Sequence, residues 1–200
     1  MVGAALAALV LPLLAACGPN APSVTPGARQ IDVSSQDLVS FKSHTDIPDC
    51  PAVPSARVDG GMPTVTLPCL GGGRQVDVAG LRGPMIVNFW ASWCGDCVRE
   101  MPALAAYAKS QSKVLVLGID YLDTQPGAAL QLAQRSHVAY PLLADPQGTL
   151  DKASPLPHIS GLPFTAFVDS SGKVVHVEAG AMKTEADVTA AAHQYLGASG

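Results

Sequence analysis

Two cysteines separated by two residues are the side chains of this sequence best suited to chemistry. They lie in the run W-C-G-D-C at 93–97, directly after the mostly apolar run M-I-V-N-F-W at 85–90. A helix that begins at Cys94 would place this thiol beside free N–H groups and the positive end of the helix dipole, which favours its ionisation. Cys97 would lie one helical turn further on, close enough to resolve a mixed disulfide. The pair therefore predicts dithiol–disulfide exchange, with Cys94 as the nucleophile.

Other roles for these two thiols are weaker alternatives. Tetrahedral zinc needs four ligands, usually from a second close pair of Cys or His, and Cys50 and Cys69 are nineteen positions apart without that spacing. A purely structural disulfide and a Cu(I) or metallochaperone role through Cys94 and Cys97 stay open. We predict no metal site and no cofactor.

The elements that must position these thiols can be read from hydrophobic periodicity. The apolar runs at 85–90 and 114–119 indicate central strands buried on both faces, and apolar residues at helical spacing between them predict a helix from Cys94 or Gly95 to about Ser110. Further predicted elements are short strands at 64–67 and 75–78 around a glycine turn, a helix capped by Thr124 that ends near Ser136, strands at 164–169 and 173–178, and a last helix that Thr184 and Asp187 cap. This order predicts an α/β domain with a mixed central sheet and helices on both faces.

The chain begins with a segment that we assign to targeting. Residues 2–16 are apolar or Gly apart from one proline, which suits a signal peptide and is too short to span about 30 Å of hydrocarbon. The segment ends in L-A-A-C, which resembles the bacterial lipobox and implies a lipid on Cys17. No Lys or Arg precedes Arg29, so the positively charged start is missing, and a start further upstream would leave room for a transmembrane anchor. We expect a lipoprotein-type signal peptide at 1–16, a flexible tether at 17–45 and one globular domain at 46–200.

Composition and the remaining cysteines limit the possible functions. The 200 residues are 48% hydrophobic and 14% charged, with a net charge of -4, which excludes a disordered chain, and the lack of a basic block argues against nucleic-acid binding. A lipoprotein signal peptide and a transmembrane anchor would both place the domain outside the cytoplasm, where disulfides persist. Cys50 and Cys69 are therefore expected to form a structural disulfide, which would contribute about 3 kcal/mol through its loop of about twenty residues. The alternative is a second exchange pair that relays electrons.

Several motifs together resemble one known family. The W-C-G-D-C motif after V-N-F-W is similar to the thioredoxin superfamily, and most similar to its TlpA/ResA-type membrane-tethered members, from about Thr64 to the C-terminus. Pro102 matches the proline of the active-site helix, and Gly161-Leu162-Pro163 matches the loop whose proline is cis. The stretch 121–145 matches the strand–helix insertion of the TlpA subgroup. The resemblance implies a thioredoxin-like fold with this insertion and an N-terminal β-hairpin extension.

The resemblance also suggests roles for individual residues. Asn88 replaces the buried Asp of plain thioredoxins, and a Glu at the place of Glu100 is implicated near the thiols of ResA-like proteins. We therefore expect Glu100 to be partly buried, with a raised pKa, and to accept or relay the proton of Cys97. Leu162 and Pro163 are expected to hold an extended substrate strand, and Trp93 to contribute substrate surface at the rim.

The function that follows is a thiol–disulfide oxidoreductase anchored on the outer face of the bacterial cell membrane. Its partners would be protein thiol or disulfide substrates and a membrane thiol–disulfide electron donor, and it is expected to be a monomer bound to the membrane through its lipid. Asp96 beside Cys94 disfavours the thiolate and so favours a reductant, and a ResA-like protein would reduce oxidised apocytochrome c. An oxidase of secreted thiols and the Cu(I) carrier are the alternatives.

Overall fold

The computed structural model describes residues 30–110 and 113–197, with the backbone alone at Lys152. The predicted signal peptide, Cys17 and the first part of the predicted tether lie outside the described residues. One compact unit begins at Ile31. No helix in 30–110 or 113–197 combines the length and apolar character needed to cross a bilayer.

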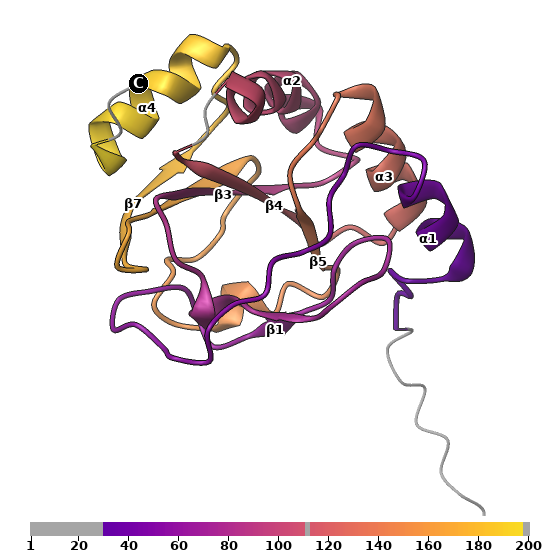
Figure 1. Cartoon of the computed structure of the whole chain (residues 1–200), viewed down its shortest axis with the longest axis horizontal. Coiled ribbons are helices and arrows are strands. Elements are labelled where there is room, and N and C mark those ends of the chain that lie inside the picture. Colours follow the sequence, from indigo (N-terminus) through magenta and orange to yellow (C-terminus); the bar gives the residue numbers. More distant parts are fainter. Residues whose placement is uncertain (1–29, 111–112, 198–200) are drawn as a thin grey trace, which may run out of the picture. The chain divides into compact units, whose positions relative to one another are not determined.

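Strands and helices alternate from β3 to β5, as expected for an α/β domain, and hairpins precede and follow this part (Figure 1). In chain order they are α1 (Gln36–Lys42), β1 (Thr66–Leu67), β2 (Val76–Asp77), the 3-10 helix η1 (Val78–Gly80), β3 (Met85–Trp90), α2 (Gly95–Ser110), β4 (Leu115–Tyr121), α3 (Pro126–Arg135), β5 (Leu142–Asp145), the 3-10 helix η2 (Leu150–Lys152), β6 (Phe164–Val168), β7 (Val174–Ala179) and α4 (Glu185–Leu196).

The main sheet is mixed and has the strand order β5-β4-β3-β6-β7. Strand β3 runs parallel to β4 and antiparallel to β6, and all six of its residues are buried. This confirms that the apolar run at 85–90 is a central strand. The separate pair β1–β2 is antiparallel and forms the predicted N-terminal hairpin. The fold is thioredoxin-like, and the predicted insertion at 121–145 contains α3 and β5.

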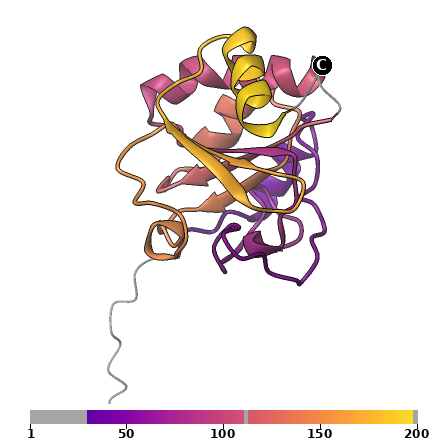
Figure 2. The same ribbon diagram turned by 90° about the vertical axis from the view of Figure 1, so that its left-hand side faces the viewer.

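The two faces of the sheet are covered differently. Helices α2, α3 and α4 pack together on one face around a shared apolar core, as Figures 1 and 2 show. The opposite face is covered by the N-terminal extension from Cys50 onward, with its β1–β2 hairpin, and by the short helices η1 and η2. Helical segments thus lie on both faces. Helices α2 and α3 share one face because both parallel crossovers, β3 to β4 and β4 to β5, advance in the same direction across the sheet.

The structure differs from the sequence prediction at the end of the tether. Residues 31–45 belong to the folded unit: α1 contacts α3, and Val33 and Ile47 are buried in the core. Helix α1 has only seven residues and no side-chain cap, and helices this short are held by tertiary packing, which local sequence does not reveal.

Two smaller predictions around the insertion also need correction. The hydrophobic pattern alone did not locate strand β5 within the insertion, because its four residues are too few to be distinguished from a loop. Thr124 does not cap α3: the cap position is Gln125, whose side chain makes no capping bond. The carboxylate of Asp123 accepts the Gln125 N–H at 2.8 Å instead. At the last helix, the capping box of Thr184 and Asp187 is confirmed.

Candidate active site

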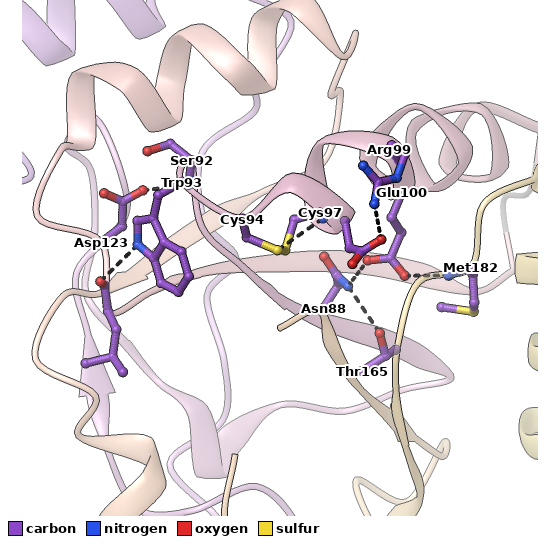
Figure 3. Close-up of a disulfide and its surroundings, with 12 residues drawn as sticks. Asn88, Ser92, Trp93, Cys94, Cys97, Arg99, Glu100, Asp123, Thr165 and Met182 are labelled. Atoms are coloured by element: carbon purple, nitrogen blue, oxygen red, sulfur yellow. Dashed lines mark hydrogen bonds and ion pairs between the residues drawn. A yellow bond between two sulfur atoms is a disulfide. The ribbon is translucent and has the colours of Figure 1, made fainter. Parts of the chain in front are cut away.

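A disulfide joins Cys94 to Cys97 where β3 leads into α2, with 2.05 Å between the sulfurs and 5.3 Å between the Cα atoms (Figure 3). The turn between Trp90 and Gly95 is tight, since the Cys94 N–H donates to the Ala91 carbonyl at 3.1 Å. Cys94 keeps 6% of its surface exposed, whereas Cys97 is fully buried. A reagent from solution can therefore reach Cys94 before Cys97.

The start of α2 is directed at the sulfur of Cys94. The backbone N–H of Cys97 lies 3.1 Å from Cys94 Sγ, and the Val98 N–H donates to the Cys94 carbonyl at 3.1 Å. An N–H of the first helical turn stabilises negative charge on a neighbouring sulfur. The geometry thus favours a Cys94 thiolate when the pair is reduced.

Glu100 lies one turn after Cys97 on the same helix, and its side chain is fully buried. Its carboxylate accepts hydrogen bonds from the Met182 backbone N–H at 3.0 Å and from Asn88 Nδ2 at 2.9 Å. Asn88 in turn donates to Thr165 Oγ1 at 3.1 Å. Figure 3 shows this group beside the disulfide. Among the described residues, neither active-site sulfur is hydrogen-bonded to Glu100.

Burial raises the pKa of Glu100 to about 7, with smaller contributions from the charges of Glu178 and Asp96. The hydrogen bonds from Met182 and Asn88 act in the opposite direction, because they stabilise the carboxylate. A carboxyl with this pKa can both take and give a proton near neutral pH. Glu100 is therefore more deeply buried than the sequence predicted, and its pKa is raised in the expected direction.

Trp93 lies on the opposite side of the disulfide from Glu100 (Figure 3). It is 58% exposed, and its Nε1–H donates to the Leu122 carbonyl at 3.3 Å. Leu122 and Val98 are also large apolar side chains at the surface, 47% and 42% exposed. Trp93 thus presents an apolar surface beside Cys94.

The turn before Cys94 is fixed by a residue that sequence reasoning missed. Asp123 is buried, and its Oδ2 accepts the Ser92 N–H at 2.6 Å. Asp123 follows β4 at the edge where the carboxyl ends of β3 and β4 meet, so a polar residue just after that strand could have been singled out.

Asp120, at the end of β4, is a second buried carboxyl beside Asp123. Burial and the neighbouring Asp123 carboxylate raise the pKa of Asp120 well above its usual range.

The charge of Asp96 beside Cys94 is partly neutralised. Arg99, three positions further along α2, pairs with the Asp96 carboxylate, and both side chains are more than half exposed. An exposed pair of this kind has a weak field. The argument from Asp96 for a reducing couple is correspondingly weaker than the sequence alone suggested.

The loop before β6 reaches the same end of the sheet. The Leu162–Pro163 peptide bond is cis, as the sequence predicted. Phe164 pairs with Phe89 near the carboxyl end of β3, which places Pro163 beside the turn that carries Cys94. The Pro163 carbonyl accepts the Gly180 N–H at 3.0 Å.

A second disulfide joins Cys50 to Cys69, with 5.8 Å between the Cα atoms. It connects the segment before β1 with the hairpin, and both residues are buried. Within residues 30–110 and 113–197, no three His, Cys, Asp or Glu side chains are grouped as metal ligands.

Known proteins match the part of the chain that holds this site. The Redoxin family model matches residues 57–194, which include both cysteines of the 94–97 disulfide and start after Lys42 and Cys50. The thiol:disulfide interchange protein DsbE homolog of Paracoccus denitrificans is 34% identical over 144 residues, which are 70% of this chain and 75% of that protein. The thiol-disulfide oxidoreductase ResA of Geobacillus thermodenitrificans is 29% identical over 119 residues, 56% of this chain and 64% of that protein.

The solved structures that resemble this fold include DsbF of MTB in its mixed oxidised and reduced forms. The two chains superpose with a TM-score of 0.54 and 30% sequence identity, over 64% of this chain and 94% of that chain.

Proposed function

The chain belongs to the Redoxin family, among the DsbE- and ResA-type thiol–disulfide oxidoreductases, and from this premise we propose that Cys94 and Cys97 are its redox-active pair. The observation that carries the proposal is the disulfide at the start of α2, with one sulfur near the surface and the other buried. Thiol–disulfide exchange needs one thiolate that attacks and one thiol that resolves.

The proposed cycle starts from the reduced pair. The Cys94 thiolate attacks one sulfur of a substrate disulfide, so a mixed disulfide forms and the other substrate sulfur leaves as a thiolate. Cys97 then loses its proton and attacks Cys94 Sγ, which releases the second substrate thiolate and restores the 94–97 disulfide. Two electrons pass from the enzyme to the substrate, and a membrane dithiol donor then reduces the 94–97 disulfide again.

Glu100 is the residue that we propose to handle the proton of Cys97. Its carboxylate is buried on the same helix and has a pKa of about 7, so it is available as a base when the resolving thiol ionises. The absence of a direct bond between Glu100 and the sulfurs among the described residues means that the proton must cross a short gap, through water or after a small movement of the reduced thiol.

The substrate surface that we propose consists of Trp93, Leu162 and Pro163. Trp93 is exposed beside Cys94, and the backbone of Leu162 lies at the end of β3 where an extended chain can pair with it. Leu122 extends the apolar surface that Trp93 begins. These contacts fit an unfolded protein segment better than a small polar disulfide.

The setting that we propose is the outer face of the bacterial cell membrane. The apolar segment at 2–16 and the L-A-A-C run support a lipoprotein signal peptide and a lipid on Cys17, followed by a tether that ends near Ile31. In that place the enzyme acts as a reductant of secreted or membrane-associated proteins, as a monomer, and oxidised apocytochrome c is the candidate substrate.

The proposal is tested with reduction of insulin by dithiothreitol. The full chain should accelerate insulin precipitation, Cys94→Ser should lose that acceleration, and the matched variant Cys17→Ser should retain it. Titration of the reduced protein with Cu(I) distinguishes the alternative role: tight binding through Cys94 and Cys97 together with slow insulin reduction would favour a copper carrier. A reduction potential near -120 mV for the 94–97 disulfide, measured by equilibration with glutathione, is the value of a strong oxidant and would favour the oxidase alternative.

A further inference from the structure

A buried lysine lies against the second disulfide. Lys42, at the end of α1, is only 6% exposed, and its Nζ lies 3.2 Å from Cys69 Sγ and 3.1 Å from the Gly72 carbonyl oxygen. The third group around it is Asp49, whose Oδ1 is 3.6 Å from Nζ and whose side chain is 84% exposed. The ammonium has three N–H donors, and these are its three acceptors.

This arrangement leaves the charge of Lys42 poorly compensated while the disulfide is closed. A disulfide sulfur is a weak acceptor and carries no charge, and the exposed Asp49 is largely solvated by water. Burying a charge costs free energy unless a good partner is present. Burial accordingly lowers the pKa of Lys42, although the charge and hydrogen bond of Asp49 act against that shift. A thiolate at Cys69 would supply the missing negative partner.

The other sulfur faces a group that suits a neutral thiol. Cys50 Sγ lies 3.2 Å from the Leu142 carbonyl oxygen. In the disulfide this sulfur has no hydrogen to donate, whereas a Cys50 thiol would have one. Each sulfur of the bond therefore already faces the partner that its reduced form requires.

We propose that Cys50–Cys69 is a second redox site, which an external dithiol opens to a Cys50 thiol and a Cys69 thiolate paired with Lys42. The sequence favoured a structural disulfide, with an exchange pair as the alternative. The contacts of Lys42 and Leu142 support the alternative. This site is distinct from the one at 94–97, because Cys50 and Cys69 are bonded to each other. Lys42 and Cys50 precede the region that the Redoxin model matches, whereas Cys69 lies within it.

The end state of the opening follows from the asymmetry of the contacts. A thiolate of the dithiol attacks Cys69 Sγ, and Cys50 leaves and takes up a proton. The second thiolate of the reductant then attacks its own sulfur in the mixed disulfide and expels Cys69 as a thiolate, because Lys42 stabilises the negative charge there. One dithiol is oxidised to a cyclic disulfide, the protein gains two electrons, and one proton is released.

A cleft leads toward this bond from the surface. Its volume is about 500 Å³, and Lys42, Asp49 and the glycine run 71–73 are among the residues that line it. Gly73 has φ +116°, and a Cβ placed there would lie 3.5 Å from Cys69 Sγ, so only side-chain-free backbone separates the cleft from the sulfur. A small dithiol has an approach route here, and opening the bond would free the segment before β1 from the hairpin.

The test measures each disulfide separately in the full chain. The protein is equilibrated with dithiothreitol buffers of defined potential, quenched by alkylation, and digested with trypsin. The digest places Cys50, Cys69 and the 94–97 pair in different peptides: 43–57 (30–57 in Lys42→Met), 58–74 and 83–99. Wild-type Cys50–Cys69 should open within the range of these buffers. In Lys42→Met, the equilibrium constant for its reduction should fall about tenfold, equivalent to about 30 mV, whereas Lys42→Arg, which keeps the charge, should change it less than about threefold. The 94–97 couple should be unaffected.

A second measurement applies even if Lys42→Met fails to fold. In reduced wild-type protein, a short pulse of iodoacetamide near neutral pH should modify Cys69 faster than Cys50, and Cys69 modification should have the lower pH midpoint of the two. The proposal is overturned if the wild-type bond stays closed at every potential that opens 94–97, if Met and Arg at position 42 give equal shifts, or if the two thiols react at equal rates.

Discussion

The buried carboxyl of Glu100 gives the most quantitative prediction. Its pKa of about 7 in the folded protein compares with 4.5 for an ordinary glutamate, and the cause is burial. That difference corresponds to about 3 kcal/mol that the ionised carboxylate costs the folded state. Glu100→Gln removes this titration and keeps the shape of the side chain.

The direction of the pH effect follows from which state holds the proton. Between about pH 4.5 and about pH 7 the unfolded chain has lost the Glu100 proton while the folded protein retains it, so the stability of the wild type falls as the pH rises through this window. The Gln variant has no such loss. Its free energy of unfolding relative to the wild type should therefore increase by about 3 kcal/mol from acid to alkaline pH. In the Gln variant an amide donor can face Asn88 Nδ2, which would lower the free energy of unfolding by about 1 kcal/mol. This loss would be the same at every pH.

The assay is urea unfolding of the oxidised protein at a series of pH values. Glu185→Gln, at the exposed start of α4, is the control for the loss of a surface carboxylate. It removes the acceptor of the Ser110 hydroxyl and should not become more stable relative to the wild type as the pH rises. The pH profile of insulin reduction should also lose an inflection near pH 7 in Glu100→Gln if this carboxyl handles the proton of Cys97. A stability difference that is flat with pH would refute the claim that burial raises the pKa of Glu100.

Two further variants test the surroundings of the disulfide. Trp93→Ala removes an exposed apolar contact surface, so kcat/KM for insulin should fall about fivefold, equivalent to about 1 kcal/mol. Reduction of a small aromatic disulfide should change less than about twofold. Equal losses with both substrates would contradict a role of Trp93 in holding protein chains. Asp123→Ala leaves the N–H groups of Ser92 and Gln125 without their acceptor, so urea unfolding should show a loss of about 2 kcal/mol and insulin reduction should slow, whereas unchanged stability would show that the carboxylate does not fix this turn.

The parts of the fold and site that sequence could predict are those encoded by neighbouring residues. The 85–90 run is apolar apart from Asn88 and is a central strand, the Cys94 and Cys97 spacing lies within one helical turn, and the Thr184–Asp187 capping box is a local pattern. In each case the residues that decide the structure are within a few positions of one another.

The parts that sequence could not predict depend on distant contacts. Glu100 is held by a backbone N–H at Met182, 82 residues away, and Lys42 reaches Cys69 across 27 residues. Helix α1 exists because it packs against α3, and nothing within its seven residues required a helix. A lysine near the end of the predicted tether therefore gave no sign that it would be buried.

Covalent trapping with a disulfide-containing peptide tests the central claim most directly. Reduced Cys97→Ser has an attacking thiol at Cys94 and no resolving thiol, so it should accumulate a mixed disulfide that mass spectrometry locates in the tryptic peptide 83–99. Reduced Cys94→Ser, in which only the buried Cys97 remains in that peptide, should accumulate almost none. Equal trapping by the two variants, or trapping through Cys97 alone, would contradict the assignment of Cys94 as the nucleophile and Cys97 as the resolving thiol.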